Sequence, residues 1–342
     1  MRFDLRDLAL PIIGAPMAGG PSTPRLAAAV TDAGGLGFLA AGYLSATRLA
    51  SDIEAARAAT TGPLAVNIFV PGASLAVPAE LARYREQLEP LAARYGSELG
   101  DPHPDDDGWA DKLDVVADLR PEVVSFTFGC PDADVFARLR AVDVLALVTV
   151  TTRAEAQLAV AAGADGLVAQ GPRAGGHRGT FDPGAPPAEQ PLADLLDAVV
   201  GVAGELPVIA AGGLATAADI SGVLGRGARA AQIGTALLLA DEAGTNAAHR
   251  SALHSDEFTE TVVTRAFSGR YARGLRNDFT RSFGDSAPLG YPEVNQMTSP
   301  LRRAAVAAGD PHGTNLWAGT AFGLAQARPA ADIVTELAAT PR

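Results

Sequence analysis

Eight short apolar runs recur along this chain, and helix-forming segments separate them. The runs cover residues 12–15, 36–40, 64–68, 123–126, 144–150, 166–170, 207–211 and 230–233. Strands that are apolar on both faces and alternate with helices are typical of a parallel sheet covered by helices. Eight such units close naturally into an α/β fold of the (β/α)8 TIM barrel type, which we predict here. An open, doubly wound parallel sheet is the alternative.

Helix boundary signals agree with this alternation. Three of the intervening segments, 23–34, 152–163 and 216–227, begin with threonine and end at or near glycine, as capped helices do. In the second of them, Thr152 and Glu155 have the spacing of a capping box. Local capping signals and apolar periodicity therefore predict the same helices.

The length of 342 residues exceeds the roughly 250 that a bare barrel needs. We predict a (β/α)8 barrel domain over residues 1–240, with a helical insertion at about 71–120 after the third strand. Residues 241–342 are predicted to form a C-terminal cap that packs on the barrel and returns to it. In the insertion, an apolar stripe with helical spacing is expected to pack against the barrel rim. The stripe consists of Leu81, Tyr84, Leu88, Leu91 and Tyr95.

Composition limits the partners of this chain. A formal net charge of -12 argues against a broad basic surface for nucleic acid or an anionic membrane, and no run approaches the roughly 18 apolar residues of a membrane span. The single cysteine, Cys130, excludes an intrachain disulfide, and the acidic segment 101–111 matches no ion-binding loop. We therefore expect a cytoplasmic protein with no metal, no nucleic acid partner and no membrane contact. A homodimer is left open.

A histidine lies among glycines just after the sixth apolar run. Residues 170–179 read Gln-Gly-Pro-Arg-Ala-Gly-Gly-His-Arg-Gly, and the imidazole belongs to His177. In a barrel, the loops at the carboxyl ends of the strands form the active site. The sequence therefore predicts an active-site loop with His177 as its chemical group. The alternative is a histidine that only ties the loop down.

Turns that contain glycine follow the seventh and eighth runs. Gly212 and Gly213 follow the seventh, whereas Gly234 and Thr235 follow the eighth and open a predicted helix. In many barrels the loops at these two positions, with a nearby helix N-terminus, hold a phosphate group. We therefore predict a phosphorylated cofactor. Glycines that serve only tight turns are the alternative.

Taken in order, these segments resemble the class I nitronate monooxygenases, which are FMN-dependent barrel enzymes. The resemblance is carried by residues 11–20, 66–69, 124–129, 170–179, 210–213, 232–235, 267–270 and 272–277. The ordered set is far more specific than any one of its members. It implies the barrel fold, FMN as the cofactor and an oxidoreductase activity.

The resemblance also implies which residues bind FMN. The end of the first strand would pass close to the flavin ring, Asn67 would bond its polar edge, and the glycine turns would surround the phosphate. The implied set is Ala15, Pro16, Met17, Asn67, Gln170, Gly175, Gly176, Gly212, Gly213, Gln232, Gly234 and Thr235. As alternatives, Met17 fills the core, and Asn67 and Gln170 satisfy backbone groups at the strand ends.

For His177, the resemblance implies the base that removes the proton α to a nitro group, or a hydrogen-bonding partner of an anionic nitronate. An imidazole suits this role because its ordinary pKa of about 6.5 leaves much of it neutral at working pH. The other histidines are expected in loops or on solvated helix faces, with surface or structural roles. They are His103, His249, His254 and His312.

A basic run stands out in the C-terminal part of this acidic chain. It consists of Arg265, Arg270, Arg273, Arg276 and Arg281. These arginines either neutralise an anionic substrate or help close the cap over the flavin. Arginines that only bridge the cap to an acidic barrel rim are the alternative. Ser268 is a weak candidate for substrate contact. Thr320 stands where relatives commonly carry a glutamine that contacts the flavin, and threonine is too short for that reach.

The resemblance implies oxidative denitrification of alkyl nitronates such as propionate 3-nitronate, and of neutral nitroalkanes after loss of the α proton. The small-molecule substrate and O2 would give a carbonyl compound and nitrite. One alternative is an FMN- and NAD(P)H-dependent enoyl-thioester (enoyl-ACP) reductase, which shares the Ala-Gly-Gly-His loop, although residues 267–277 favour the monooxygenases. The other alternative is a non-catalytic flavin-binding protein.

Overall fold

The computed structural model describes residues 2–339, and eight parallel strands form its centre. A bridge between Ile13 and Leu36 joins the first strand to the second, which completes the circle. The predicted (β/α)8 barrel is confirmed, and each predicted apolar run overlaps one strand. The strands are β1 (Ile12–Gly14), β2 (Gly37–Ala40), β3 (Leu64–Phe69), β4 (Val123–Thr127), β5 (Leu145–Val150), β6 (Gly166–Gln170), β8 (Val208–Ala211) and β9 (Ala230–Ile233).

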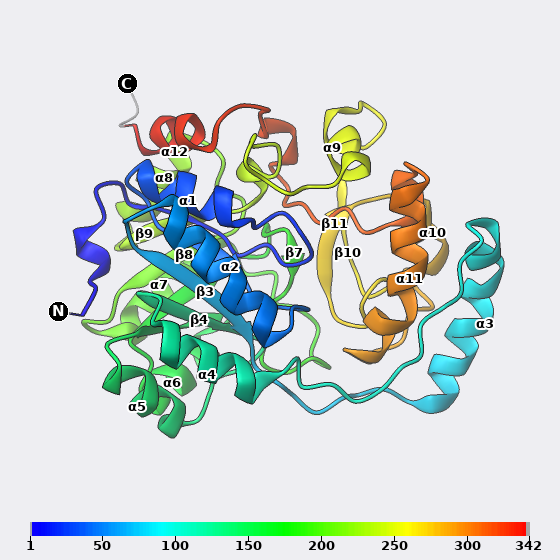
Figure 1. Ribbon diagram of the computed structural model, residues 1–342, viewed down its shortest axis with the longest axis horizontal. Helices are drawn as coiled ribbons and strands as arrows, with labels where there is room; N and C mark the ends of the chain where they lie inside the picture. Colours follow the sequence, from blue (N-terminus) through cyan, green and yellow to red (C-terminus); the bar gives the residue numbers. More distant parts are fainter. Residues whose placement is uncertain (1, 340–342) are drawn as a thin grey trace.

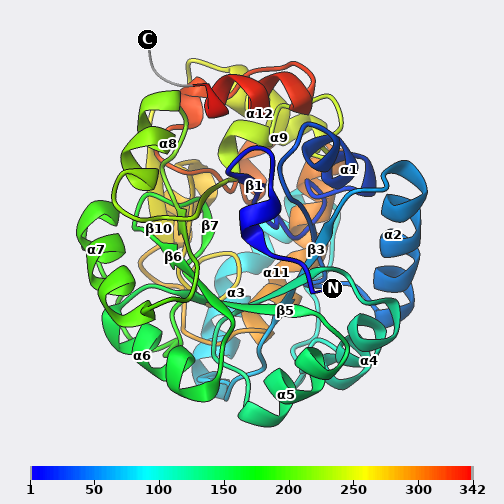
Figure 2. The ribbon, with the colours of Figure 1, turned by 90° about the vertical axis from the view of Figure 1, so that its left-hand side faces the viewer.

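Helices surround these strands, as Figure 2 shows. They are α1 (Pro24–Asp32), α2 (Ala46–Ala59), α4 (Trp109–Leu119), α5 (Ala133–Ala141), α6 (Arg153–Ala162), α7 (Leu192–Ala203) and α8 (Ala217–Leu224). Thr23 caps α1, and Thr216 forms a complete capping box with Asp219 at the start of α8. These start signals explain why the helices begin where the sequence predicts.

The predicted capping box of α6 is only half formed. The Thr152 side chain accepts a hydrogen bond from the Glu155 N–H, as expected. The Glu155 carboxylate does not return the bond to Thr152. It accepts instead from the N–H groups of Thr151 (2.6 Å) and Phe181 (2.8 Å). Glu155 therefore ties the helix to the loop after β6, a contact that local sequence does not encode.

After β9, the chain builds a cap beside the carboxyl ends of the strands. Its elements are α9 (Ala247–His254), β10 (Thr261–Thr264), β11 (Ala272–Leu275), α10 (Asp278–Phe283), α11 (Glu293–Ala307), the 3-10 turn η3 (Pro311–Gly313) and α12 (Ala330–Ala338). Helix α12 returns to the barrel and packs against α1 and α8 (Figure 1). Strands β10 and β11 form an antiparallel sheet with β7 (Gly176–His177), which belongs to the loop after β6. No strand was predicted at any of these three positions.

The segment between β3 and β4 holds α3 (Pro78–Arg94) as well as α4. Helix α4 packs on α2 and β3 and completes the barrel unit that leads to β4. The inserted part therefore ends before residue 109, whereas the sequence analysis extended it to about 120. The sequence does not reveal this boundary, because α4 follows a turn-rich stretch and no additional strand precedes it to mark it as a barrel helix.

The apolar stripe of α3 packs against the cap. Tyr84 and Leu88 belong to one buried cluster with Val294 and Met297 of α11. The Tyr84 hydroxyl donates to the carbonyl oxygen of Ala266 at 2.6 Å. Figure 1 shows α3 beside α11, away from the barrel. The prediction that this stripe packs on the barrel rim is wrong, because α11 presents an apolar face of its own that α3 buries.

Apolar side chains fill the barrel interior. Leu36, Phe38, Leu147 and Ile209 form a buried cluster there together with Leu5 of an N-terminal 3-10 turn. A filled barrel is a packed core without a channel. A ligand can therefore bind only at the ends of the barrel, and the loops that carry the predicted site residues lie at the carboxyl ends of the strands.

Two kinds of feature are absent from residues 2–339. No helix in this range combines the length and the apolar character needed to cross a membrane. No three histidine, cysteine, aspartate or glutamate side chains of these residues gather as metal ligands. In the acidic segment 101–111, Asp107 instead pairs with the buried ammonium group of Lys112 at 2.7 Å.

Substitution of Gly37 tests how closely α1 packs on the barrel. A Cβ at Gly37 would lie 1.9 Å from the carbonyl oxygen of Ala27. Gly37→Ala is therefore expected to lower the free energy of unfolding by about 1–3 kcal/mol, because the backbone must shift. In α8, a Cβ at Gly222 meets nothing within 4 Å. Gly222→Ala should stabilise the protein by about 0.5–1 kcal/mol. Urea unfolding that moved both variants in the same direction would contradict this packing.

Candidate active site

A cavity of about 580 Å³ lies at the carboxyl ends of the strands, between the barrel and the cap. Small-molecule sites typically have volumes of about 300–1,000 Å³. The structure brings His177 to this cavity together with every residue that the resemblance implies for FMN. These are Ala15, Pro16, Met17, Asn67, Gln170, Gly175, Gly176, Gly212, Gly213, Gln232, Gly234 and Thr235.

A short sheet holds His177 in place. In the pairing of β7 with β11, His177 lies opposite Ala272. The side chain of Gln170 spans the same turn: its amide nitrogen donates to the His177 carbonyl (3.1 Å), and its carbonyl accepts from the Gly179 N–H (2.9 Å). Gln170 therefore satisfies backbone groups, which was the alternative to a flavin contact for this residue. It also lines the cavity.

A buried serine orients the His177 ring. Nε2 of His177 lies 2.8 Å from Oγ of Ser268, whose side chain is 1% exposed. Oγ of Ser268 also lies 3.1 Å from the Arg270 carbonyl oxygen. The hydroxyl either donates to this carbonyl and accepts from Nε2, or donates to Nε2, according to the tautomer of the ring. Ser268 does not line the cavity, so it positions His177 and does not make the predicted substrate contact.

Three aromatic rings enclose the imidazole. The ring centroids of Phe128, Trp317 and Tyr291 lie 5.5, 5.6 and 5.9 Å from that of His177. They belong to the loop after β4, the segment after η3 and the loop before α11. Rings from three separate segments leave the imidazole little room to change rotamer.

The surroundings of His177 keep its ring neutral. Burial is the largest cause that lowers its pKa, to about 3, and the positive charges of Arg270 and Arg302 lower it further. The Arg270 guanidinium lies 4.0 Å from the ring centroid of Phe128. At physiological pH, His177 is therefore an uncharged imidazole that can accept a proton.

The turns after β8 and β9 meet beside this histidine. Gly212 and Gly213 have φ angles of +105° and +78°, which favour glycine. After β9, the chain forms only a single 3-10 turn, η2 (Thr235–Leu237), so the helix predicted there is wrong. The chain leaves the barrel for the cap at this point. The Thr235 hydroxyl accepts from the Gly319 N–H at 2.9 Å.

Residues 317–321 close the cavity next to these turns. A Cβ on Gly175 would lie 2.5 Å from backbone atoms of Ala318 and Gly319, so only glycine allows this approach. Gly319 lines the cavity, whereas Thr320 is exposed and does not. The Thr320 N–H donates to the Arg173 carbonyl at 3.2 Å. The Thr320 side chain therefore makes no contact with the cavity.

The basic run connects the cap to the barrel loops. Arg273 donates to the Pro172 carbonyl at 3.1 Å, and Arg270 donates to the Thr180 carbonyl. The other three arginines make contacts inside the cap: Arg265 with Tyr271, Arg276 with Glu260 and Arg281 with Asp278. None of the five lines the cavity, so direct contact with an anionic substrate there is wrong. The bridging alternative holds, although the barrel partners are carbonyls and not an acidic rim.

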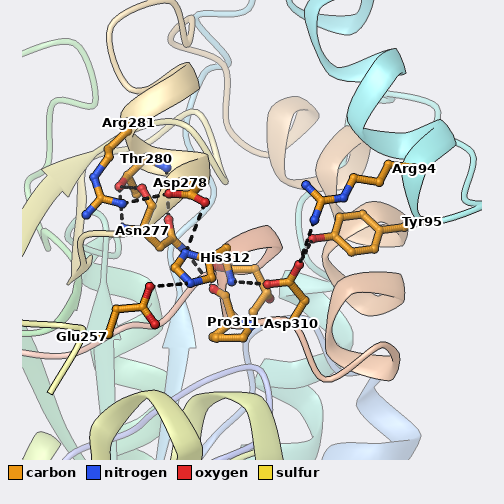
Figure 3. A network of polar contacts seen from close by, with 11 residues as sticks. Arg94, Tyr95, Glu257, Asn277, Asp278, Thr280, Arg281, Asp310, Pro311 and His312 are labelled. Carbon is orange, nitrogen blue, oxygen red and sulfur yellow. Dashed lines mark hydrogen bonds and ion pairs between the residues drawn. The ribbon is translucent and has the colours of Figure 1, made fainter. Parts of the chain in front are cut away.

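A polar network fixes the turn that leads into the cavity wall (Figure 3). The Asn277 side chain donates to the carbonyls of Pro311 (2.9 Å) and Thr314 (2.8 Å). The Asp310 carboxylate accepts from the Tyr95 hydroxyl at 2.6 Å. The network joins α3, α10 and η3, and it positions the cavity-lining segment that follows η3.

The prediction for His249 is wrong. It was expected on a solvated helix face, but it is 5% exposed and lines the cavity. Burial lowers its pKa to about 4. Asn246 caps α9 by accepting from the His249 N–H at 3.0 Å, which sets the helix so that this face points inward. His103 and His254 are exposed, and His312 belongs to the network of Figure 3.

The polar face of α11 also lines the cavity, and no motif in the sequence identified it as part of the site. Its residues include Asn295, Ser299, Arg302 and Arg303. Their spacing of about four was a signal for one helix face. Nothing in that spacing says whether the face meets solvent or a ligand site.

The fold and the cavity define a (β/α)8-barrel protein with a deep site at the carboxyl ends of its strands and a fixed, neutral imidazole in it. A sequence model of the family described as nitronate monooxygenase matches residues 4–340. The chain belongs to this family and is an oxidoreductase, as the resemblance implied. The family is a flavin-dependent class of enzymes.

Individual relatives agree with this family. A nitronate monooxygenase from Pseudomonas aeruginosa is 40% identical, covering 96% of this chain and 95% of the relative. A nitronate monooxygenase from Paraburkholderia phytofirmans is 39% identical, with 96% and 91% covered. Among solved structures, nitroalkane oxidase from Streptomyces ansochromogenes is 47% identical with a TM-score of 0.93, covering 97% and 95%. FabK from Thermotoga maritima is 26% identical with a TM-score of 0.74, covering 97% and 93%.

The neutral state of His177 can be read directly by NMR. A histidine whose pKa is lowered on folding stays neutral below its ordinary pKa of about 6.5. The imidazole carbon signals of His177 are those that disappear from the spectrum of His177→Gln. At about pH 5 they should be the signals of a neutral ring, whereas the urea-unfolded chain should show charged rings at the same pH. A charged ring for His177 in the folded protein at that pH would contradict this assignment.

Proposed function

We propose that this protein uses FMN and O2 to oxidise alkyl nitronates, giving a carbonyl compound and nitrite. The observation that carries the proposal is a neutral imidazole, fixed by Ser268, which shares one cavity with the residues that the resemblance implies for FMN. The names of the relatives support the same reaction. The reductase alternative has weaker support, because FabK is a more distant match.

The residues of the cavity fit FMN by their chemistry. Ala15 and Met17 offer an apolar surface for a flavin ring. The Asn67 amide nitrogen donates to Ser125 and Thr127, which leaves its carbonyl oxygen free to accept from the polar edge of the ring. The glycine turns after β8 and β9 suit the phosphate, since bare backbone lets N–H groups approach it. The flavin would thus lie within residues 1–240, with 241–342 covering it.

Bound FMN would accept the electrons of the substrate and pass them to O2. His177 would contact the substrate at the nitro-bearing carbon, either as the acceptor of the α proton or as a hydrogen-bonding partner of the nitronate oxygens. The aromatic rings around it would keep the imidazole in place. Ser268 would hold the ring in one orientation during turnover.

The lowered pKa of His177 bears on which substrate is preferred. A base with a pKa of about 3 holds an abstracted proton poorly, because burial and two nearby arginines destabilise the imidazolium. An anionic nitronate needs no such abstraction, and its charge is favoured by the same arginines. We therefore expect preformed nitronates to react faster than neutral nitroalkanes.

The cytoplasmic location and the homodimer stay predictions.

The visible spectrum of the purified protein and anaerobic bleaching test the proposed function. The flavin should bleach with propionate 3-nitronate or ethyl nitronate, and not with NADH or NADPH. Rapid bleaching by NAD(P)H alone would move the assignment to the reductase. Absence of any flavin would remove the cofactor from the proposal, and a flavin that no donor bleaches would favour the non-catalytic alternative.

His177→Asn separates proton handling from cofactor binding. The variant should retain its flavin and lose about 10²- to 10⁴-fold in kcat/KM on neutral nitroalkanes, which is the usual contribution of a general base. The loss on preformed nitronates should be smaller. His254→Asn, at an exposed position, is the matched control and should keep the parent values. Parent activity of His177→Asn on both substrate types would exclude His177 from the reaction.

A further inference from the structure

The Phe128 ring stands between two cavities. It lines the large cavity that contains His177, and it also lines a second cavity of about 40 Å³. That second cavity lies between Leu75 of the loop after β3 and Leu289 of the segment before α11. The two cavities share one further lining residue, Phe69, whose ring centroid is 4.5 Å from that of Phe128. These two rings therefore form the wall between the cavities.

The backbone of Phe128 is strained. Its φ angle is +80°, in the left-handed region that a bulky aromatic residue rarely adopts. Such a conformation persists only where the surrounding structure fixes it, and it is most common at functional sites. Two groups of the cap fix this ring: the Arg270 guanidinium lies 4.0 Å from its centroid, and the Tyr291 ring lies 5.5 Å away. The cap thus holds Phe128 in a position that its backbone disfavours.

Phe128 also borders the place where the substrate would react. Its ring centroid is 5.5 Å from that of His177, the group proposed to contact the nitro-bearing carbon. An alkyl group on that carbon therefore lies close to an apolar surface. Behind the ring, Arg270 and Asp107 line the second cavity. The ring thus separates these two charged side chains from the cavity at His177.

We propose that Phe128 determines the length of the alkyl group that the site accepts. Its ring closes the large cavity beside His177 and keeps the second cavity out of reach of the substrate. This inference rests on the proposed function and names its substrate class: nitronates with short alkyl groups. A longer chain has to displace the ring, and the contacts with Arg270 and Tyr291 oppose that displacement.

Straight-chain carboxylates test the wall without turnover, because a carboxylate is a planar anion like a nitronate. Calorimetry on the FMN-loaded protein gives dissociation constants for butyrate and octanoate. The parent should bind octanoate no more tightly than butyrate. Phe128→Ala joins the two cavities and should bind octanoate at least about tenfold more tightly than butyrate, since each buried CH2 is worth about fourfold.

Phe136→Ala is the matched control for this measurement. Phe136 is a buried ring of α5 that lines neither cavity, so its loss costs packing without moving the wall. The control should keep the parent ratio of the two dissociation constants. A parent that already prefers octanoate, or equal ratios in the parent and in Phe128→Ala, would overturn the proposal.

Turnover extends the comparison to nitronates. The ratio of kcat/KM for hexyl 1-nitronate to that for ethyl nitronate should rise at least about tenfold in Phe128→Ala, by the same gain per CH2. Phe128→Leu keeps a smaller apolar side chain and should give an intermediate ratio. An equal loss on both nitronates in the two variants would mean that Phe128 only holds His177, and would overturn the proposal.

Two pairs of variants test the strain by urea unfolding. At Phe126, inside the extended strand β4, the glycine variant should unfold at a lower urea midpoint than the alanine variant. At Phe128 the order should reverse, because only glycine adopts a positive φ without cost. The same order at both positions would show a ring that is free to turn aside, and would overturn the proposal.

The outcomes separate this proposal from the proposed function. If the parent oxidises no nitronate, the proposed function fails, whereas the binding of octanoate and butyrate still decides whether Phe128 limits chain length. If nitronates are oxidised and the ratios do not change in Phe128→Ala or Phe128→Leu, the wall fails and the proposed function stands.

Discussion

The pairing of β7 with β11 is the contact on which the site depends. It draws the glycine loop after β6 into a sheet of the cap, so that His177 is set by backbone hydrogen bonds from a segment almost a hundred residues away. Gln170 secures the loop from the barrel side, and Ser268 fixes the ring from the cap side. The barrel and the cap therefore both position this imidazole, and neither alone would hold it.

The charge around this cavity is opposite in sign to the net charge of the whole chain. The chain carries a net charge of -12, yet Arg270 and Arg302 lie near His177 without carboxylate partners among the described residues. Burial makes the imidazole neutral and makes each unpaired guanidinium costly. An anionic nitronate would relieve that cost at Arg302, which lines the cavity, and we therefore expect nitronates to react faster than neutral nitroalkanes. The same field that weakens His177 as a base strengthens the cavity as an anion site.

Much of the fold could be predicted from local pattern. Every strand of the barrel matched an apolar run, because a strand covered by helices must be apolar on both faces. The residues at the carboxyl ends of those strands, from Ala15 to Thr235, met at one cavity because parallel strands deliver their ends to the same rim. The errors have a different origin. The stripe of α3, the inward position of His249 and the role of Ser268 all depend on which distant surface each one meets.

The sequence by itself determined the barrel, its strand ends and the glycines that let backbones approach there, since periodicity, capping and backbone conformation are local properties. Only the tertiary structure decided what surrounds His177. The lowered pKa and the serine partner arise from groups on α11 and on the segment between β10 and β11. Their distances to His177 depend on how the cap packs, and no local pattern encodes packing between segments this far apart in the chain.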